Sequence, residues 1–344
     1  MREKIRIGVD AMGGDFAPKN EIEGALLALD YFKAKGDNSV EICLYGVEEK
    51  IRKVSKENNF NLTNLKIVDS PDVIDMHDDP TEILKTKKNS SLYKGLTAVK
   101  QKEMEGFVSG GNTGATLATS TVVLGRIPGV SRPTIAAFFP TINPRPTLLL
   151  DVGATVDHKS RFLYEFAIMG SIYYKTVYKI ENPTVALLNV GEEDSKGTDV
   201  LRETYSMLKE SNLNFAGNME GRDILKGSAD VIVCDGYVGN VILKFAESFK
   251  NVLKTKIKDF ASKSVSNKVK AGMALPALKG VFKEFDYQEY GGVPILGVNG
   301  ISIVGHGSSS AIAVQNMIIR AKELVEFGLV QSIEQSISIN SKSN

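Results

Sequence analysis

Short runs of Val, Ile and Leu alternate with longer amphipathic stretches along almost the whole chain. The short runs do not alternate apolar with polar positions, so they predict strands that are buried on both faces of a sheet. These strands cover residues 5–9, 40–45, 65–68, 106–109, 134–139, 147–151, 184–189, 230–234 and 301–304. Helical periodicity and capping residues predict helices over about 18–35, 90–104, 158–178, 194–211, 238–262, 268–285 and 308–326.

This order of elements predicts the α/β class, with three layers (α/β/α) around a mixed, largely parallel central sheet. We expect one domain over residues 1–330 of the 344-residue chain. The helices at about 238–285 are an insertion that such a sheet does not need, and they predict a protruding helical pair. The polar tail at 331–344 is rich in Ser and Asn and is expected to be frayed.

Composition excludes several classes of function. The chain has 42 Lys and Arg against 41 Asp and Glu, so it offers no overall field for nucleic acid, and we predict no nucleic-acid partner. Its 2 cysteines form no CxxC pair, which indicates a reducing, cytoplasmic setting. The charged first residues predict no secretory signal. The three histidines, at 77, 158 and 306, share no ligand spacing, so we predict no metal.

Polar turns that contain glycine follow two of the predicted strands, which is where open α/β sheets bind ligands. The turn DAMGGD places Asp10, Gly13 and Gly14 before a helix. The turn SGGNTGA places Asn112, Thr113 and Gly114 at a helix start, where backbone and side-chain donors favour phosphate or a carbonyl oxygen. Neither a P-loop lysine nor a GxGxxG pattern is present. A tight turn with Asp as the capping residue is the alternative interpretation of DAMGGD.

Further turns follow the same pattern. They contribute Asp151 in LLLDVGA, Lys196 in the GEE–KG loop, Asn218 in GNMEGRD, Asp235, Asn240 and Lys244 in VCDGYVGNVILK, and His306 and Ser308 in GHGSS. Each alone is compatible with a structural turn. Because so many polar turns that contain glycine follow strands, together they indicate a binding site.

The motifs quoted above, together with IPGVSRP and YGGVPILGV, occur along the chain in the same order as in one family of proteins. The resemblance to this family covers about residues 5–319. This family is the phosphate acyltransferases of bacterial phospholipid synthesis, which are acyl-acyl-carrier-protein:phosphate acyltransferases. One departure is Thr155, where Asn is expected. The resemblance implies a phosphotransacetylase-like, isocitrate dehydrogenase-like fold, a homodimer and no cofactor. It also implies transfer of a long acyl group from acyl carrier protein to inorganic phosphate, and peripheral association of the cytoplasmic enzyme with the membrane.

The implied chemistry sets the expected roles. Phosphate is itself the nucleophile, so the protein must position it and stabilise the oxyanion. We expect Asn112, Thr113 and Gly114 to bind phosphate or the carbonyl, with Asn240 and Lys244 nearby. We expect His306 and Ser308 to polarise the carbonyl or protonate the leaving group, oriented by Asp235 or Asp10. The rest of the expected substrate and phosphate site comprises Asp10, Gly13, Gly14, Asp151, Lys196 and Asn218.

Three other functions stay open at this point. The first is a phosphotransacetylase-like enzyme that uses acyl-coenzyme A, and the second is a metal-dependent dehydrogenase. The third is a regulator that only sequesters the acylated carrier. A basic docking face for the acidic carrier protein would favour the carrier as donor.

A lysine-rich segment breaks the charge balance of the chain. Residues 250–283 hold nine lysines and one acid, Asp259. Within it, Val269, Met273, Leu275 and Leu278 lie beside lysines and predict a tip that docks on an anionic membrane. The alternative is that the lysines dock the carrier protein and the tip packs on a partner subunit. The apolar stripe of the preceding helix predicts a dimer or core interface: Ile242, Phe245, Phe249, Leu253, Ile257 and Phe260.

Overall fold

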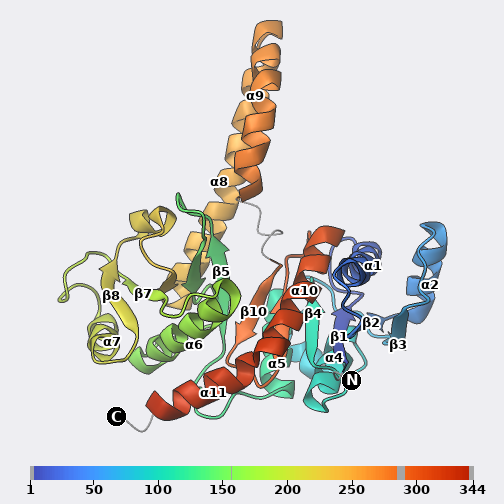
Figure 1. Cartoon of the computed structure of the whole chain (residues 1–344). Helices are drawn as coiled ribbons and strands as arrows, with labels where there is room; N and C mark the ends of the chain where they lie inside the picture. Colours follow the sequence, from blue (N-terminus) through green and yellow to red (C-terminus); the bar gives the residue numbers. More distant parts are fainter. Residues whose placement is uncertain (1–3, 156, 285–290, 341–344) are drawn as a thin grey trace.

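The computed structural model describes residues 4–155, 157–284 and 291–340, and it confirms the three-layer α/β/α architecture (Figure 1). Eleven strands form one sheet in the order β3-β2-β1-β4-β11-β10-β5-β6-β9-β7-β8. The strands are β1 (Ile5–Asp10), β2 (Val40–Gly46), β3 (Leu65–Asp69), β4 (Gly106–Ser109), β5 (Thr134–Phe139), β6 (Thr147–Leu150), β7 (Thr184–Leu188), β8 (Asn214–Met219), β9 (Val231–Val233), β10 (Val293–Leu296) and β11 (Ile301–Val304).

The direction of the sheet reverses near its middle. β10 pairs antiparallel with both β11 and β5, and β5 pairs antiparallel with β6. On either side of these pairings the strands are parallel to their neighbours. The carboxyl ends of β1, β4 and β11 therefore point the opposite way along the sheet from those of β6, β7 and β9.

Helices cover both faces of the sheet. They are α1 (Lys19–Ala34), α2 (Glu48–Glu57), α3 (Pro80–Thr86), α4 (Ser91–Lys100), α5 (Thr113–Val123), α6 (Ser160–Tyr178), α7 (Asp199–Lys209), α8 (Gly236–Ser262), α9 (Val265–Glu284), α10 (Ala311–Phe327) and α11 (Leu329–Asn340), with a 3₁₀ turn at Gly221–Lys226. Helices α1, α2, α6, α7, α10 and α11 contribute to the apolar core on one face. Helices α3, α4, α5 and α8 contribute to the core on the other.

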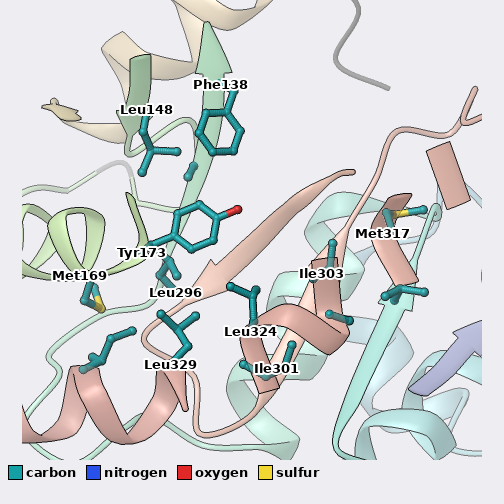
Figure 2. Close-up of a cluster of buried hydrophobic side chains, with 14 of the residues drawn as sticks. Phe138, Leu148, Met169, Tyr173, Leu296, Ile301, Ile303, Met317, Leu324 and Leu329 are labelled. Carbon is teal, nitrogen blue, oxygen red and sulfur yellow. The ribbon is translucent and has the colours of Figure 1, made fainter. Parts of the chain in front are cut away.

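The larger core is continuous across the point of reversal. Figure 2 shows Tyr173 of α6 beside Phe138 of β5 and Leu296 of β10, with Leu324 and Leu329 close by. All five side chains are buried in one apolar cluster. The two parallel parts of the sheet therefore share one core.

Helices α8 and α9 form a pair that extends away from the body of the molecule (Figure 1, orange). The protruding pair at about 238–285 is thus confirmed for its described part, and residue 285 lies outside the described residues. Pro276 lies inside α9 without ending it. Among the described residues, no helix is long and apolar enough to span a membrane.

The structure differs from the sequence predictions at elements with a weak apolar pattern. Strands β8 and β10 and helices α2 and α3 were not predicted, because each is short or highly polar. The tail is not frayed as predicted: α11 runs to Asn340, and its Leu329, Ile333 and Ile337 are buried. Residues 341–344 lie outside the described part of the chain.

Candidate functional site

Three glycine turns at the carboxyl ends of β1, β4 and β11 lie against one another, and we call them the turn cluster (residues 10–15, 109–114 and 305–309). The N–H of Gly305 donates to the carbonyl of Ser109 at 2.8 Å, and the N–H of Asp15 donates to that of Gly307 at 2.7 Å. The first bond joins segments about 200 residues apart, and the second joins segments almost 300 residues apart. The turns DAMGGD, SGGNTGA and GHGSS therefore meet at one place in the fold.

Asp10 organises the inside of the turn cluster. Its carboxylate is only 5% exposed and accepts hydrogen bonds from Ser109 Oγ (2.7 Å) and the N–H of Met12 (3.1 Å). Burial raises the pKa of Asp10, and hydrogen bonds from Ser91 and Ser109 oppose that rise. A β-carbon on Gly13 would lie 2.4 Å from Asp10 Oδ2, so glycine is needed there. The two serines were not singled out from the sequence.

Asn112 has a capping role that the sequence prediction did not assign. Its Oδ1 accepts the N–H of Ala115 at 3.0 Å, and its amide nitrogen donates to the carbonyls of Met76 (3.0 Å) and Asp78 (3.2 Å). The side chain therefore caps α5 and ties it to the segment before α3. The first turn of α5 has N–H groups at Thr113 and Gly114 that lack intrahelical acceptors, and these favour an anion.

His306 lies exposed on the rim of the turn cluster. The N–H of Ser308 donates to His306 Nδ1 at 3.2 Å, and Ser308 Oγ lies 2.9 Å from the same nitrogen. Because a backbone N–H can only donate, Nδ1 is the acceptor in this contact, which leaves Nε2 to carry the ring proton. Asp10 and Asp235, which were expected to orient this ring, form no hydrogen bond to it within the described residues.

A second group of turns surrounds Asp151 after β6. Asp151 is completely buried, and it accepts the N–H groups of Ala154 (2.9 Å) and Thr155 (2.8 Å). Burial raises its pKa, and these backbone hydrogen bonds oppose the rise. A β-carbon on Gly239 would lie 1.8 Å from the Asp151 carbonyl oxygen, so α8 packs directly on this turn. The structure favours a structural role for Asp151 over the predicted contact with phosphate.

The predicted site residues on α8 belong to this second group. Asp235 caps α8 by accepting the N–H of Val238 at 2.9 Å. Asn240 is exposed beside Gly153, and Lys244 forms an ion pair with Glu247 at 2.9 Å. Within the described residues, no hydrogen bond or ion pair joins Asn240 or Lys244 to Asn112, so the structure does not show the expected proximity.

Lys196 and Asn218 form a third group, at the carboxyl ends of β7 and β8. The Asn218 amide donates to the carbonyl of Glu193 at 2.8 Å, and the Asn189 amide donates to that of Lys196 at 3.1 Å. The Lys196 ammonium is exposed and lies 4.0 Å from a Glu193 carboxylate oxygen. These contacts shape the loop after β7.

Of the three groups, the turn cluster combines a helix N-terminus, close-packed glycine backbone and a histidine proton. This combination can hold a dianion and stabilise developing charge on a neighbouring oxygen. Within the described ranges, no three His, Cys, Asp or Glu side chains lie close enough to form a metal site.

Comparisons with known proteins agree with this arrangement. A family model described as "Fatty acid synthesis protein" matches residues 5–332. The chain is 46% identical to the phosphate acyltransferase of Chlorobaculum parvum, covering 97% of this chain and 99% of that one. It is 43% identical to the phosphate acyltransferase of Halothermothrix orenii, with 97% and 99% covered.

Solved structures show the same fold at low identity. A phosphotransacetylase from Streptococcus pyogenes is similar with a TM-score of 0.62 and 17% identity, covering 94% of each chain. The EutD phosphotransacetylase of Staphylococcus aureus is similar with a TM-score of 0.58, also at 17% identity, covering 93% of this chain and 94% of that one. The chain therefore belongs to the phosphate acyltransferase family and is an acyltransferase enzyme.

Proposed function

We propose that this enzyme transfers a long-chain fatty acyl group from the thioester of acyl carrier protein to inorganic phosphate. The products are acyl-phosphate, used for phosphatidic acid and phospholipid synthesis, and free carrier. The observation that carries the proposal is the turn cluster, in which hydrogen bonds join the three turns that carry Asp10, the α5 N-terminus and His306. The names of the relatives support phosphate as the acceptor.

In the proposed reaction, the N–H groups of Thr113 and Gly114 hold the phosphate dianion. A phosphate oxygen forms a bond to the thioester carbonyl carbon, and the C–S bond then breaks with its electron pair leaving on sulfur. His306 Nε2–H polarises the carbonyl or supplies the proton that the thiolate takes up. Ser308 fixes the ring through Nδ1.

The other predicted residues have supporting or separate parts in this proposal. Asp10, Gly13 and Gly14 shape the phosphate-binding backbone, and Asn112 fixes the start of α5. Asp151, Asp235, Asn240 and Lys244 lie in the second group and receive no chemical step. Lys196 and Asn218 shape the loop after β7, from which the exposed Lys196 ammonium is available to an anion.

The test supplies purified protein with phosphate and either palmitoyl carrier protein or palmitoyl-coenzyme A, then traps acyl-phosphate with hydroxylamine. We expect multiple turnovers with the carrier, strict dependence on phosphate, and much lower activity with coenzyme A. Preference for coenzyme A would instead assign the phosphotransacetylase-like function. A single turnover without release would favour the sequestering regulator, and a reaction independent of phosphate would refute the proposal.

Peripheral docking on an anionic membrane is the second part of the proposal. Val265, Val269 and Met273 of α9 are 81%, 57% and 78% exposed, and their spacing of four places them on one side of the helix. Exposed Lys263, Lys268 and Lys270 lie around them. Burial of each apolar side chain in lipid contributes about 1.5–3 kcal/mol before ordering costs, and each lysine near anionic headgroups adds about 1 kcal/mol.

The predicted tip residues do not all share that side of α9. The turn between α8 and α9 lies at residues 263–264, and Leu275 follows Met273 by two residues, which places it on nearly the opposite side of the helix. Leu275 is 45% exposed and Leu278 is half-buried. We therefore propose Val269 and Met273, with Val265, as the lipid-contacting residues.

A homodimer is the third part of the proposal. On α8, Phe245, Phe249 and Phe260 are 71%, 55% and 45% exposed, so this chain leaves much of the apolar stripe predicted from the sequence uncovered. A second copy that packs on the stripe would remove these side chains from water. Sedimentation equilibrium of the full chain tests this, and we expect a dimer that Phe245→Glu dissociates.

A further inference from the structure

Glu21 is a buried acidic side chain that the reaction described above does not use. It lies in the first turn of α1 and is only 2% exposed. Its Oε2 atom is buried and has no hydrogen-bond partner within the described residues. An ionised carboxylate in such surroundings is very costly unless it is paired. The position therefore favours a neutral carboxylic acid.

The packing of α1 keeps Glu21 in this place. A β-carbon on Gly24, one turn further along α1, would lie 2.5 Å from Val314 Cβ of α10. The Asn20 amide also donates to the carbonyl of Ser309 at 2.9 Å. Because α1 is held so closely against the start of α10, the first turn of α1 stays enclosed, and Glu21 is buried there.

Glu21 lies directly beneath the turn cluster. A β-carbon on Gly14 would be 2.9 Å from Glu21 Oε1, 3.4 Å from the carbonyl oxygen of Gly307 and 3.7 Å from that of Gly110. Gly14 has a φ of 136°, which an L side chain rarely adopts. The Glu21 carboxyl therefore packs against the residue at which all three turns meet.

We infer that Glu21 is a positioning residue for phosphate, which supports the Gly13–Gly14 turn as a neutral acid and weakens phosphate binding when it ionises. This inference rests on the proposed transfer to phosphate. The physical reason is that an ionised Glu21 would add a second negative charge, beside Asp10, directly under a site that must accept a dianion. It would also draw water or cations toward a turn that is now closely packed.

The protonation behaviour of Glu21 agrees with its packing. Burial raises its pKa to about 8, and the nearby Asp10 carboxylate contributes to the rise. Several elements around α1 carry other charged or titratable residues: Asp15 and His306 on the loops, Glu41 on β2, Glu48 to Glu57 on α2, and Arg320 on α10. Asp10, on β1, is the charged group that raises the pKa of Glu21, and the groups named above do not contribute to that shift.

The experiment measures KM for phosphate and kcat between pH 6.5 and 9.5, with the wild-type chain and Glu21→Gln. If only the neutral acid supports binding, KM in the wild type, expressed as the concentration of the phosphate dianion, rises about tenfold from pH 7 to pH 9, while kcat changes little. In Glu21→Gln, which cannot ionise, the ratio of the two KM values falls to about one. Glu23→Gln, on the same helix but partly exposed, is the matched control and keeps the wild-type ratio.

The inference is wrong if Glu21→Gln shows the same rise in KM as the wild type. If Glu21→Gln does not fold, the wild type alone decides, through the increase in Tm that inorganic phosphate produces at pH 7 and at pH 9. We expect that increase to be largely lost at pH 9, and an equal increase at both values overturns the inference. Absence of acyl-phosphate from the wild type at pH 7 would instead refute the proposed function, and the Tm measurement would still test Glu21.

Discussion

Replacement of Asn112 by alanine tests whether this side chain holds the turn cluster together or binds substrate directly. The structure assigns three hydrogen bonds to the side chain, one that caps α5 and two that tie α5 to residues 76–78. Loss of an N-cap costs about 1 kcal/mol, and each hydrogen bond between neutral groups contributes about 0.5–1.5 kcal/mol. We therefore expect Asn112→Ala to lower the free energy of unfolding by about 2–4 kcal/mol.

Asn112→Asp separates the contribution of the N-cap from the contribution of the two hydrogen bonds to Met76 and Asp78. A carboxylate caps the helix as well as an amide does, but it cannot donate to the carbonyls of Met76 and Asp78, which it would instead repel. We expect Asn112→Asp to lose the ties and keep the cap, so its Tm also falls. Thr113→Ala, in which an exposed neighbour loses only its side chain, is the control and should unfold near the wild-type temperature.

The assay combines thermal unfolding followed by circular dichroism with steady-state kinetics at saturating acyl donor. A loss of about 2–4 kcal/mol corresponds to a fall in Tm of about 3–6 °C in a chain of 344 residues, because the entropy of unfolding rises with chain length. KM for phosphate should rise in the same variants, since the Thr113 and Gly114 amides depend on the anchored start of α5. A normal Tm together with a large loss of kcat would refute the structural role and assign Asn112 to direct contact with substrate.

Three further predictions concern the His306 ring, the exposed side of α9 and the expected absence of a metal. His306→Ala should lower kcat by about 10²–10³-fold with Tm within about 1 °C, because the ring is exposed; a normal kcat would remove His306 from the chemistry. Met273→Asp should abolish sedimentation with vesicles that contain phosphatidylglycerol, whereas Leu275→Asp, on the other side of α9, should retain most of it; equal behaviour of the two variants would contradict the assigned face. Acyl-phosphate formation should be unchanged after treatment with EDTA, and activity that returns only with added Mg²⁺ or Zn²⁺ would contradict the predicted absence of a metal.

The parts of the fold that sequence patterns predict well are those whose apolar residues are consecutive or regularly spaced. The apolar runs at β1, β2 and β6 predict buried strands, because consecutive apolar side chains are unfavourable in contact with water. Helix α11 shows the limit of this reasoning: its apolar Leu329, Ile333 and Ile337 have helical spacing, but its polar composition indicated a frayed end. Packing against α6 stabilises it, and no local pattern reports that packing.

The candidate site shows the same division. The sequence by itself showed the turns at strand ends, because glycine, Asn and Asp favour tight turns, and it showed that one of these turns carries a histidine. Only the tertiary structure decided which turns meet, since the reversal of direction through β10 and β5 separates the Asp151 turn from the Asp10 turn. It also decided that Glu21 lies buried beneath Gly14 with an Oε2 atom that has no partner among the described residues, because burial depends on α10, almost 300 residues away along the chain.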